Sequence, residues 1–209
     1  IDTGGKTTVI RVHSKEMDHK PYVEVDLPKI GRSLRVRMRR RGPRQNRFDL
    51  HGMTLESVQP GGLVLHNAGV GASRFRAILH EEHFETHLAS LNPHLVMVEY
   101  GTNDYLYEDQ IKPELEGEIR ASIERIRRAT PDAMILLVSA QDLYRKSKNL
   151  ESGVAYSDLL HRIAAQEKVA LFDWYWIAGG GRTLKQWRDA GLARKDLIHL
   201  TSKGYRFKG

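Results

Sequence analysis

Three short polar segments of the sequence could carry chemistry. They are Asn67–Ala72, Gly101–Asp104 and Asp196–His199. A histidine close to a carboxylate is the residue pair that general acid–base catalysis uses most often, and side-chain amides or backbone N–H groups of glycine-containing loops can stabilise a developing negative charge. Each segment alone is weak evidence, because Gly-Thr-Asn-Asp is usually a simple turn and Asp-x-x-His pairs are common. Their joint occurrence in this order is more informative.

The elements between these segments indicate how they are positioned. Four apolar runs have the length of strands, and their near-continuous hydrophobicity is typical of parallel strands covered on both faces. The runs are Leu63–His66, Leu95–Val98, Met134–Val138 and Val169–Phe172. Helical spacing of apolar residues predicts helices over 74–91, 115–129 and 154–166. The alternation predicts an α/β fold with a flavodoxin-like, doubly wound parallel sheet, and ligands bind beyond the carboxyl ends of strands in such sheets.

Residues 6–58 have a different pattern, one of short alternating runs separated by turn signals. The expected strands are Thr7–Val12, Tyr22–Leu27, Leu34–Arg40 and Phe48–Leu55. They predict an antiparallel β segment, part of a β-sandwich, that precedes the α/β part. The composition changes near residues 58–62, so we expect one domain over 1–60 and a second over 61–209.

The three polar segments resemble sequence blocks of the SGNH hydrolases, a family of serine esterases. The matching order is Asn-x-Gly after a strand, Gly-x-Asn-Asp after the next, and a final Asp-x-x-His-Leu-Thr-x-x-Gly-Tyr, over residues 63–209. The tail from Trp187 to Thr201 is similar to the branch that removes O-acetyl groups from peptidoglycan and other polysaccharides. That branch can carry a β-sandwich, similar to a carbohydrate-binding module, inserted after the nucleophile block.

The resemblance implies a role for each residue of the three segments. His199 would be the general base, and Asp196 would hold its tautomer and stabilise the imidazolium. Asn103 and the backbone N–H groups of Gly71 and Ala72 would stabilise the oxyanion. Support of the loops would fall to four residues. They are Asn67, Gly69, Gly101 and Asp104.

Two departures from the family pattern bear on activity. Ala72 occupies the position of the family's oxyanion glycine, which leaves a backbone N–H but changes the conformational preference of the loop. The nucleophile block Gly-Asp-Ser is absent from the 209 residues. We expect the N-terminal part of the same polypeptide, before Ile1, to supply the serine; the alternative is a pseudoenzyme. Ser73 lies outside such a motif.

Composition excludes several kinds of site. The chain has no cysteine, which rules out disulfides, thiol catalysis and thiolate metal ligands. His80, His83 and His87 are read as a polar helix face rather than a metal site, because they lack an H-E-x-x-H frame.

At least one aromatic residue of Trp174–Trp176 should lie in the core, because the segment follows a buried strand.

Charge is unevenly distributed along the chain. Residues 1–60 contain 13 Lys and Arg against 7 Asp and Glu, and eight arginines lie between Arg32 and Arg47. Residues 61–209 are together close to neutral. The arginines are interpreted as a solvated strand face, with an anionic glycan as the functional alternative; the absence of interleaved aromatics argues against nucleic acid.

The resemblance to the SGNH hydrolases implies hydrolysis of O-acetyl esters on a carbohydrate by a serine–His199–Asp196 triad, without cofactor or metal. The alternatives are an inactive scaffold that binds glycan and an O-acetyltransferase. We expect no membrane span. A periplasmic or secreted location follows from the resemblance alone.

Overall fold

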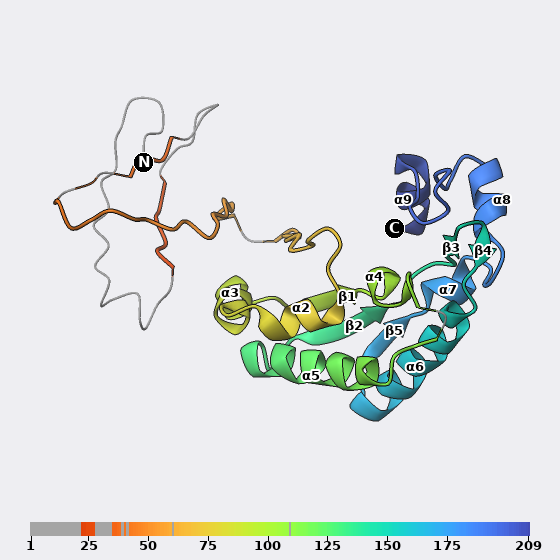
Figure 1. The fold of residues 1–209 in the computed structure, drawn as a ribbon. Coiled ribbons are helices and arrows are strands. Elements are labelled where there is room, and N and C mark those ends of the chain that lie inside the picture. The colour runs from red at the N-terminus through yellow and green to blue at the C-terminus, as the bar shows by residue number, and fades with distance from the viewer. Residues whose placement is uncertain (1–21, 28–34, 39, 41, 60, 109) are drawn as a thin grey trace. The chain divides into compact units, whose positions relative to one another are not determined.

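The chain forms two compact units, and the residues His199, Asn103 and Ala72 of the three polar segments all belong to the second. The computed structural model describes residues 22–27, 35–38, 40, 42–59, 61–108 and 110–209 (Figure 1). Unit 1 spans Ile1–Ala68 and unit 2 spans Gly69–Gly209. The division therefore separates Asn67 from the rest of its predicted loop.

A three-stranded parallel sheet is the centre of unit 2. Its strands are β1 (Leu95–Glu99), β2 (Met134–Val138) and β5 (Ala170–Phe172), in the order β1-β2-β5. The register places Leu95 beside Met134 and Leu136 beside Ala170. These strands coincide with three of the four predicted apolar runs, so the prediction of a mixed α/β unit with a parallel sheet is confirmed.

Two long helices pack along one face of this sheet (Figure 1). They are α5 (Glu114–Ala129) and α6 (Ser152–Glu167), both where apolar periodicity predicts them. Ile119, Ile123 and Ile126 of α5 are at most 1% exposed, so the predicted stripe is the centre of the core. No helix within the described ranges is long and apolar enough to cross a membrane.

Shorter elements follow the carboxyl ends of the strands. They are α4 (Thr102–Tyr105), β3 (Tyr144–Arg145), β4 (Lys148–Asn149), α7 (Trp174–Ile177), α8 (Leu184–Asp189) and α9 (Ser202–Lys208). β3 and β4 form a small antiparallel hairpin. Trp174 and Tyr175 are buried, whereas Trp176 is half-exposed, which confirms that part of this aromatic segment belongs to the core.

The helix predicted over 74–91 is in fact two helices. α2 spans Phe75–His80 and α3 spans Phe84–Leu91, with extended backbone at Glu81. Arg125 of α5 explains the break, because its guanidinium donates to the carbonyls of Ile78 and Glu81, which continuous helix would otherwise use. His80 therefore ends one helix and His83 precedes the next, and the described residues contain no cluster of metal-ligating side chains.

The fourth predicted strand of the sheet, Leu63–His66, does not form. Leu63 is 92% and Leu65 is 82% exposed, so this run lacks the burial that stabilises a parallel strand. Tyr22–Leu27 and Phe48–Leu55 likewise contain no strand, and most of their large apolar side chains, including those of Tyr22 and Phe48, are exposed. Thr7–Val12 and part of Leu34–Arg40 lie outside the described residues. A β-sandwich is thus not shown.

Asp173 joins the ends of two strands to α6. Its carboxylate accepts hydrogen bonds from Ser139 Oγ (2.8 Å) and Ser157 Oγ (2.6 Å), and contacts His161 Nε2 at 2.7 Å. Burial raises the pKa of Asp173, but these hydrogen bonds outweigh it and lower the pKa overall. An ionised carboxylate therefore fixes β2, β5 and α6 together on the side of the sheet where the polar turns lie.

Candidate active site

The Asp196–His199 turn forms a closed carboxylate–imidazole pair. Oδ2 of Asp196 lies 2.9 Å from Nδ1 of His199, while Oδ1 accepts the backbone N–H groups of Ile198 (2.9 Å) and His199 (3.0 Å). Burial raises the pKa of Asp196, but the hydrogen bonds from the His199 backbone and imidazole lower it overall. The carboxylate is therefore ionised at neutral pH and can stabilise an imidazolium.

The pair presents one ring nitrogen to solvent. The His199 side chain is 57% exposed, and Asp196 occupies only its Nδ1 atom. In the described part of the chain Nε2 makes no hydrogen bond, and no serine is hydrogen-bonded to His199. Ser73 accepts the Asn103 side-chain amide through its backbone carbonyl, and no hydrogen bond joins its hydroxyl to His199 among the described residues. The histidine is thus oriented for proton transfer at Nε2, but the described residues supply no nucleophile.

A strained residue lies between the two members of the pair. Leu197 has φ of 55°, in the left-handed region, which costs a residue with a Cβ about 1–2 kcal/mol. Its side chain is 7% exposed, and its carbonyl accepts the N–H of Tyr144 at 3.1 Å. Arg194 N–H donates to the His199 carbonyl at 2.8 Å. Burial and backbone bonds therefore hold the turn in a conformation that it would not adopt alone.

The turn after β1 is organised by a buried carboxylate. Asp104 is 7% exposed and accepts the backbone N–H groups of Phe75 (3.1 Å) and Gly101 (3.0 Å). Gly101 has φ of 116°, and a Cβ there would lie 2.4 Å from the Tyr156 ring, so this position requires glycine. The predicted loop-supporting residues Gly101 and Asp104 thus both have a specific structural reason to be there.

Asn103 connects this turn to the predicted oxyanion loop. Its Nδ2 donates to the carbonyl of Ser73 at 3.1 Å. Residues 70–73 form a tight turn in which the N–H of Ser73 donates to the carbonyl of Val70 at 3.3 Å, and Gly71 and Ala72 are exposed. The structure therefore brings Asn103 next to the Gly71–Ala72 turn. Gly69 lies in the same unit, whereas Asn67 belongs to unit 1.

Ala72 occupies a backbone conformation that favours glycine. Its φ is 62°, so the turn needs a left-handed residue. We expect Ala72→Gly to raise the free energy of unfolding by up to about 1 kcal/mol, because relief of the strain exceeds the entropy that glycine adds to the unfolded chain. Urea denaturation measures this difference.

Ala155→Gly is the matched control for that substitution. Ala155 is exposed within α6, where glycine should cost about 1 kcal/mol. An equal loss of stability in both variants would contradict a left-handed requirement at Ala72.

A residue that the sequence analysis missed links the two predicted halves of the site. Gln141 lies three residues after the end of β2. Its side-chain Nε2 donates to the Ile198 carbonyl at 2.7 Å, and its backbone carbonyl accepts the Tyr105 hydroxyl at 3.3 Å. A continuous path thus runs from the turn after β1 to the His199 turn. The polar segment Ser139–Asp142 after an apolar strand is the same signal that marks Gly101–Asp104, and could have identified it.

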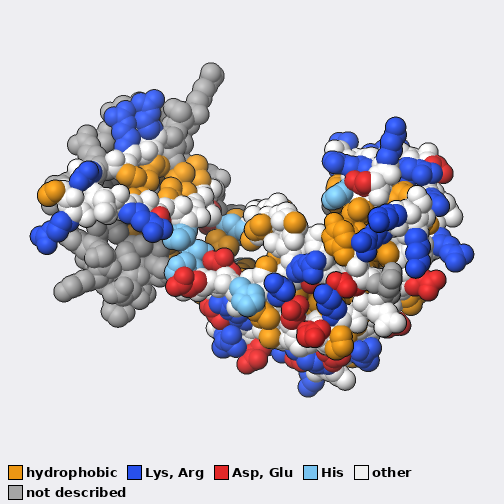
Figure 2. Space-filling model, in the orientation of Figure 1, with side chains coloured by type: hydrophobic (Ala, Val, Ile, Leu, Met, Phe, Trp, Pro, Cys, Tyr) orange, Lys and Arg blue, Asp and Glu red, His pale blue; other side chains and the backbone are white. Residues whose placement is uncertain are grey.

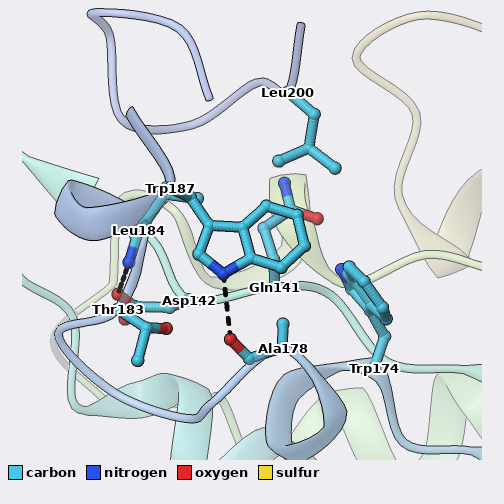
Figure 3. A pocket seen from close by; sticks show the side chains of 8 residues that line it. All are labelled: Gln141, Asp142, Trp174, Ala178, Thr183, Leu184, Trp187 and Leu200. Carbon is cyan, nitrogen blue, oxygen red and sulfur yellow. Dashed lines mark hydrogen bonds between the residues drawn. The ribbon is translucent and has the colours of Figure 1, made fainter. Parts of the chain in front are cut away.

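A narrow, mostly apolar hollow lies beside the His199 turn (Figure 3). It is lined by Gln141, Asp142, Trp174, Ala178, Thr183, Leu184, Trp187 and Leu200. Asp142 accepts the N–H of Leu184 at 3.1 Å, and Trp187 Nε1 donates to the Ala178 carbonyl at 3.1 Å. Trp174 Nε1 is buried without a partner among the described residues.

Comparison with known proteins identifies the family. The profile of the GDSL-like Lipase/Acylhydrolase family matches residues 42–207. The chain belongs to this family. The expected membership of the SGNH/GDSL-type family is thereby confirmed, and this family is one of ester hydrolases. No curated protein sequence matches the chain.

Solved structures of GDSL-like and related hydrolases share the fold. A peptidoglycan O-acetylesterase is 25% identical, with a TM-score of 0.57 over 61% of this chain and 38% of its own. A putative GDSL-like lipase from Parabacteroides merdae is 15% identical, with a TM-score of 0.54 over 68% of each chain. The GDSL-like chain thus spans well under two thirds of the length of the O-acetylesterase.

Proposed function

We propose that this GDSL-like chain is part of a serine esterase that removes O-acetyl groups from a carbohydrate. The single observation that supports this most directly is the Asp196–His199 pair, whose bond at Nδ1 leaves Nε2 exposed. The similarity to a peptidoglycan O-acetylesterase points to acetylated peptidoglycan or a related polysaccharide as the substrate. Such a substrate would place the enzyme in the periplasm or outside the cell.

The proposed reaction needs a serine from the preceding part of the polypeptide and no cofactor. Nε2 of His199 takes the proton of the serine hydroxyl as the oxygen attacks the acetyl carbonyl. Asp196 holds the imidazole and stabilises the imidazolium. His199 then gives the proton to the departing sugar oxygen, which leaves an acetyl-serine and a free sugar hydroxyl. A water, deprotonated by His199, attacks the acetyl-serine. His199 then returns that proton to the departing serine oxygen, which releases acetate and restores the serine hydroxyl.

Two groups are proposed to stabilise the tetrahedral oxyanion. One is the side-chain amide of Asn103, which has a second N–H beyond the one it donates to Ser73. The other is the backbone N–H of Ala72 or Gly71 in the adjacent exposed turn. Removing one such donor typically costs roughly 3–4 kcal/mol of transition-state stabilisation. Asp104 acts indirectly, because both of its oxygens bind backbone N–H groups.

The polypeptide including its residues before Ile1 provides the test. We expect it to release acetate from O-acetylated peptidoglycan and to be labelled covalently on one serine in those residues by a fluorophosphonate. Chemically de-O-acetylated peptidoglycan serves as the control substrate and should release none. Absence of both acetate release and serine labelling would leave a non-catalytic scaffold, contrary to the proposal.

A further inference from the structure

The net charge of residues 61–209 is close to zero, but positive and negative residues are unevenly distributed along this part of the sequence. Residues 69–181 contain 12 Lys and Arg against 17 Asp and Glu, whereas residues 182–208 contain eight against two. The two acids are Asp189 and Asp196. Positive charge in unit 2 is thus concentrated in the segment that carries the Asp196–His199 pair.

This segment, the basic lobe (residues 182–208), is held together as one structural piece. The N–H of Leu192 donates to the Trp187 carbonyl at 2.7 Å, and that of Thr201 donates to the Leu192 carbonyl at 2.9 Å. A shared apolar cluster that includes Leu184, Leu197 and Leu200 lies beneath. Figure 2 shows Lys and Arg side chains crowded over the part of the surface formed by α8 and α9.

At least six of the twelve Lys and Arg in residues 69–181 form ion pairs with neighbouring acids. They are Lys112, Arg120, Arg125, Arg127, Arg128 and Arg162. Arg120 and Arg127 both contact Glu167, and Arg125 and Arg128 both contact Glu85. The pKa of Glu85 falls to about 2, chiefly because of its hydrogen bond to Arg125. These ion pairs therefore link α5 to α3 and to α6.

The exposed cations of the basic lobe are mostly without such partners. Six have no ion pair with any described residue. They are Arg182, Lys185, Arg194, Lys195, Lys203 and Arg206. Asp189 pairs with Arg188, and Asp196 is occupied by His199. Concentrated, uncompensated positive charge around one turn attracts anions and raises their local concentration.

We propose that the basic lobe binds a polyanionic glycan, so that the acetyl ester is carried by an acidic polysaccharide. This inference rests on the proposed esterase function, because it identifies the charge of the substrate at the same site. A glycan is favoured over nucleic acid because carboxylic esters decorate sugars, whereas nucleic-acid backbones are phosphodiesters. The carboxylates of uronic or lactyl sugars would lie against the cations that flank His199.

Binding of labelled oligogalacturonate tests the proposal without any need for catalysis. A maltooligosaccharide of equal length provides the neutral comparison. We expect oligogalacturonate to bind, with an affinity that falls as salt rises, and the neutral oligomer to bind at least tenfold more weakly. The double variant Lys203→Glu/Arg206→Glu, which leaves His199 and Asp196 intact, should lose about tenfold or more in oligogalacturonate affinity.

Lys168→Glu is the matched control, because Lys168 is exposed beyond α6, at the opposite end of the sheet. It should leave the affinity within about twofold. A loss confined to the double variant distinguishes the basic lobe from the arginines of unit 1, which neither variant changes. Equal loss in both variants, no loss in the double variant, or equal binding of the neutral oligomer would overturn the proposal. So would equally tight, variant-sensitive binding of duplex DNA or of phosphatidylglycerol vesicles. If the proposed esterase activity is not found, the binding measurement remains valid, because binding of oligogalacturonate does not depend on catalysis.

Discussion

Replacing His199 with alanine in the polypeptide that contains the serine should lower kcat for acetyl-ester hydrolysis by about 10⁴- to 10⁶-fold. The substitution removes the group proposed to take and return the proton in both half-reactions. Asp196→Asn should also lower kcat strongly, by about 10⁴-fold, because the amide favours the wrong tautomer of the imidazole. Initial rates with 4-nitrophenyl acetate measure both effects.

His161 offers a matched control for the histidine substitution. Its side chain is 59% exposed and its Nε2 lies 2.7 Å from Asp173, so it too is a solvent-facing histidine bound to a carboxylate. It lies on α6, outside the proposed machinery, and His161→Ala should keep kcat within about twofold. Wild-type rates in His199→Ala, or equal losses in both variants, would refute the assignment of His199 as general base.

Asp104→Ala is expected to have the largest effect on stability, a loss of about 3 kcal/mol in the free energy of unfolding. The substitution leaves the backbone N–H groups of Phe75 and Gly101 buried without acceptors. Burial raises the pKa of Asp104, because it disfavours the charged carboxylate. This cost of burial offsets part of the stabilisation that the two hydrogen bonds provide. Urea denaturation of the chain measures the difference.

Asp158→Ala separates this effect from a general loss of negative charge. Asp158 is exposed on α6, and its removal should change stability by less than about 0.5 kcal/mol. Asp104→Asn should fall between the two, because one oxygen can still accept while the new NH₂ faces a donor. If Asp104→Ala unfolds at the same urea concentration as Asp158→Ala, Asp104 does not organise the turn.

Periodicity was sufficient to predict the scaffold of unit 2. β2 matches its predicted range, and Ile119, Ile123 and Ile126 of α5 line the core, because these segments bury apolar faces with a clear repeat. The Asp196–His199 pair was predictable because both members lie within one turn. Motif order and local geometry agree there.

Long-range contacts account for what the sequence could not reveal. The break between α2 and α3 depends on Arg125, more than 40 residues away, which binds the carbonyls of Ile78 and Glu81. Gln141 joins the two halves of the site through partners distant in sequence. Leu63–His66 has the composition of a buried strand but not its burial, and composition alone does not determine what covers a segment.

The tryptophans next to the His199 turn make that end of the molecule optically distinct. All three of the chain's tryptophans lie between residues 174 and 187, and Trp187 packs edge-on against both Trp174 and Phe207 of α9. Intrinsic fluorescence therefore reports the solvent environment of the basic lobe and its surroundings. Far-UV circular dichroism, in contrast, is dominated by α5 and α6. The two signals together distinguish local opening around His199 from unfolding of the scaffold that carries it.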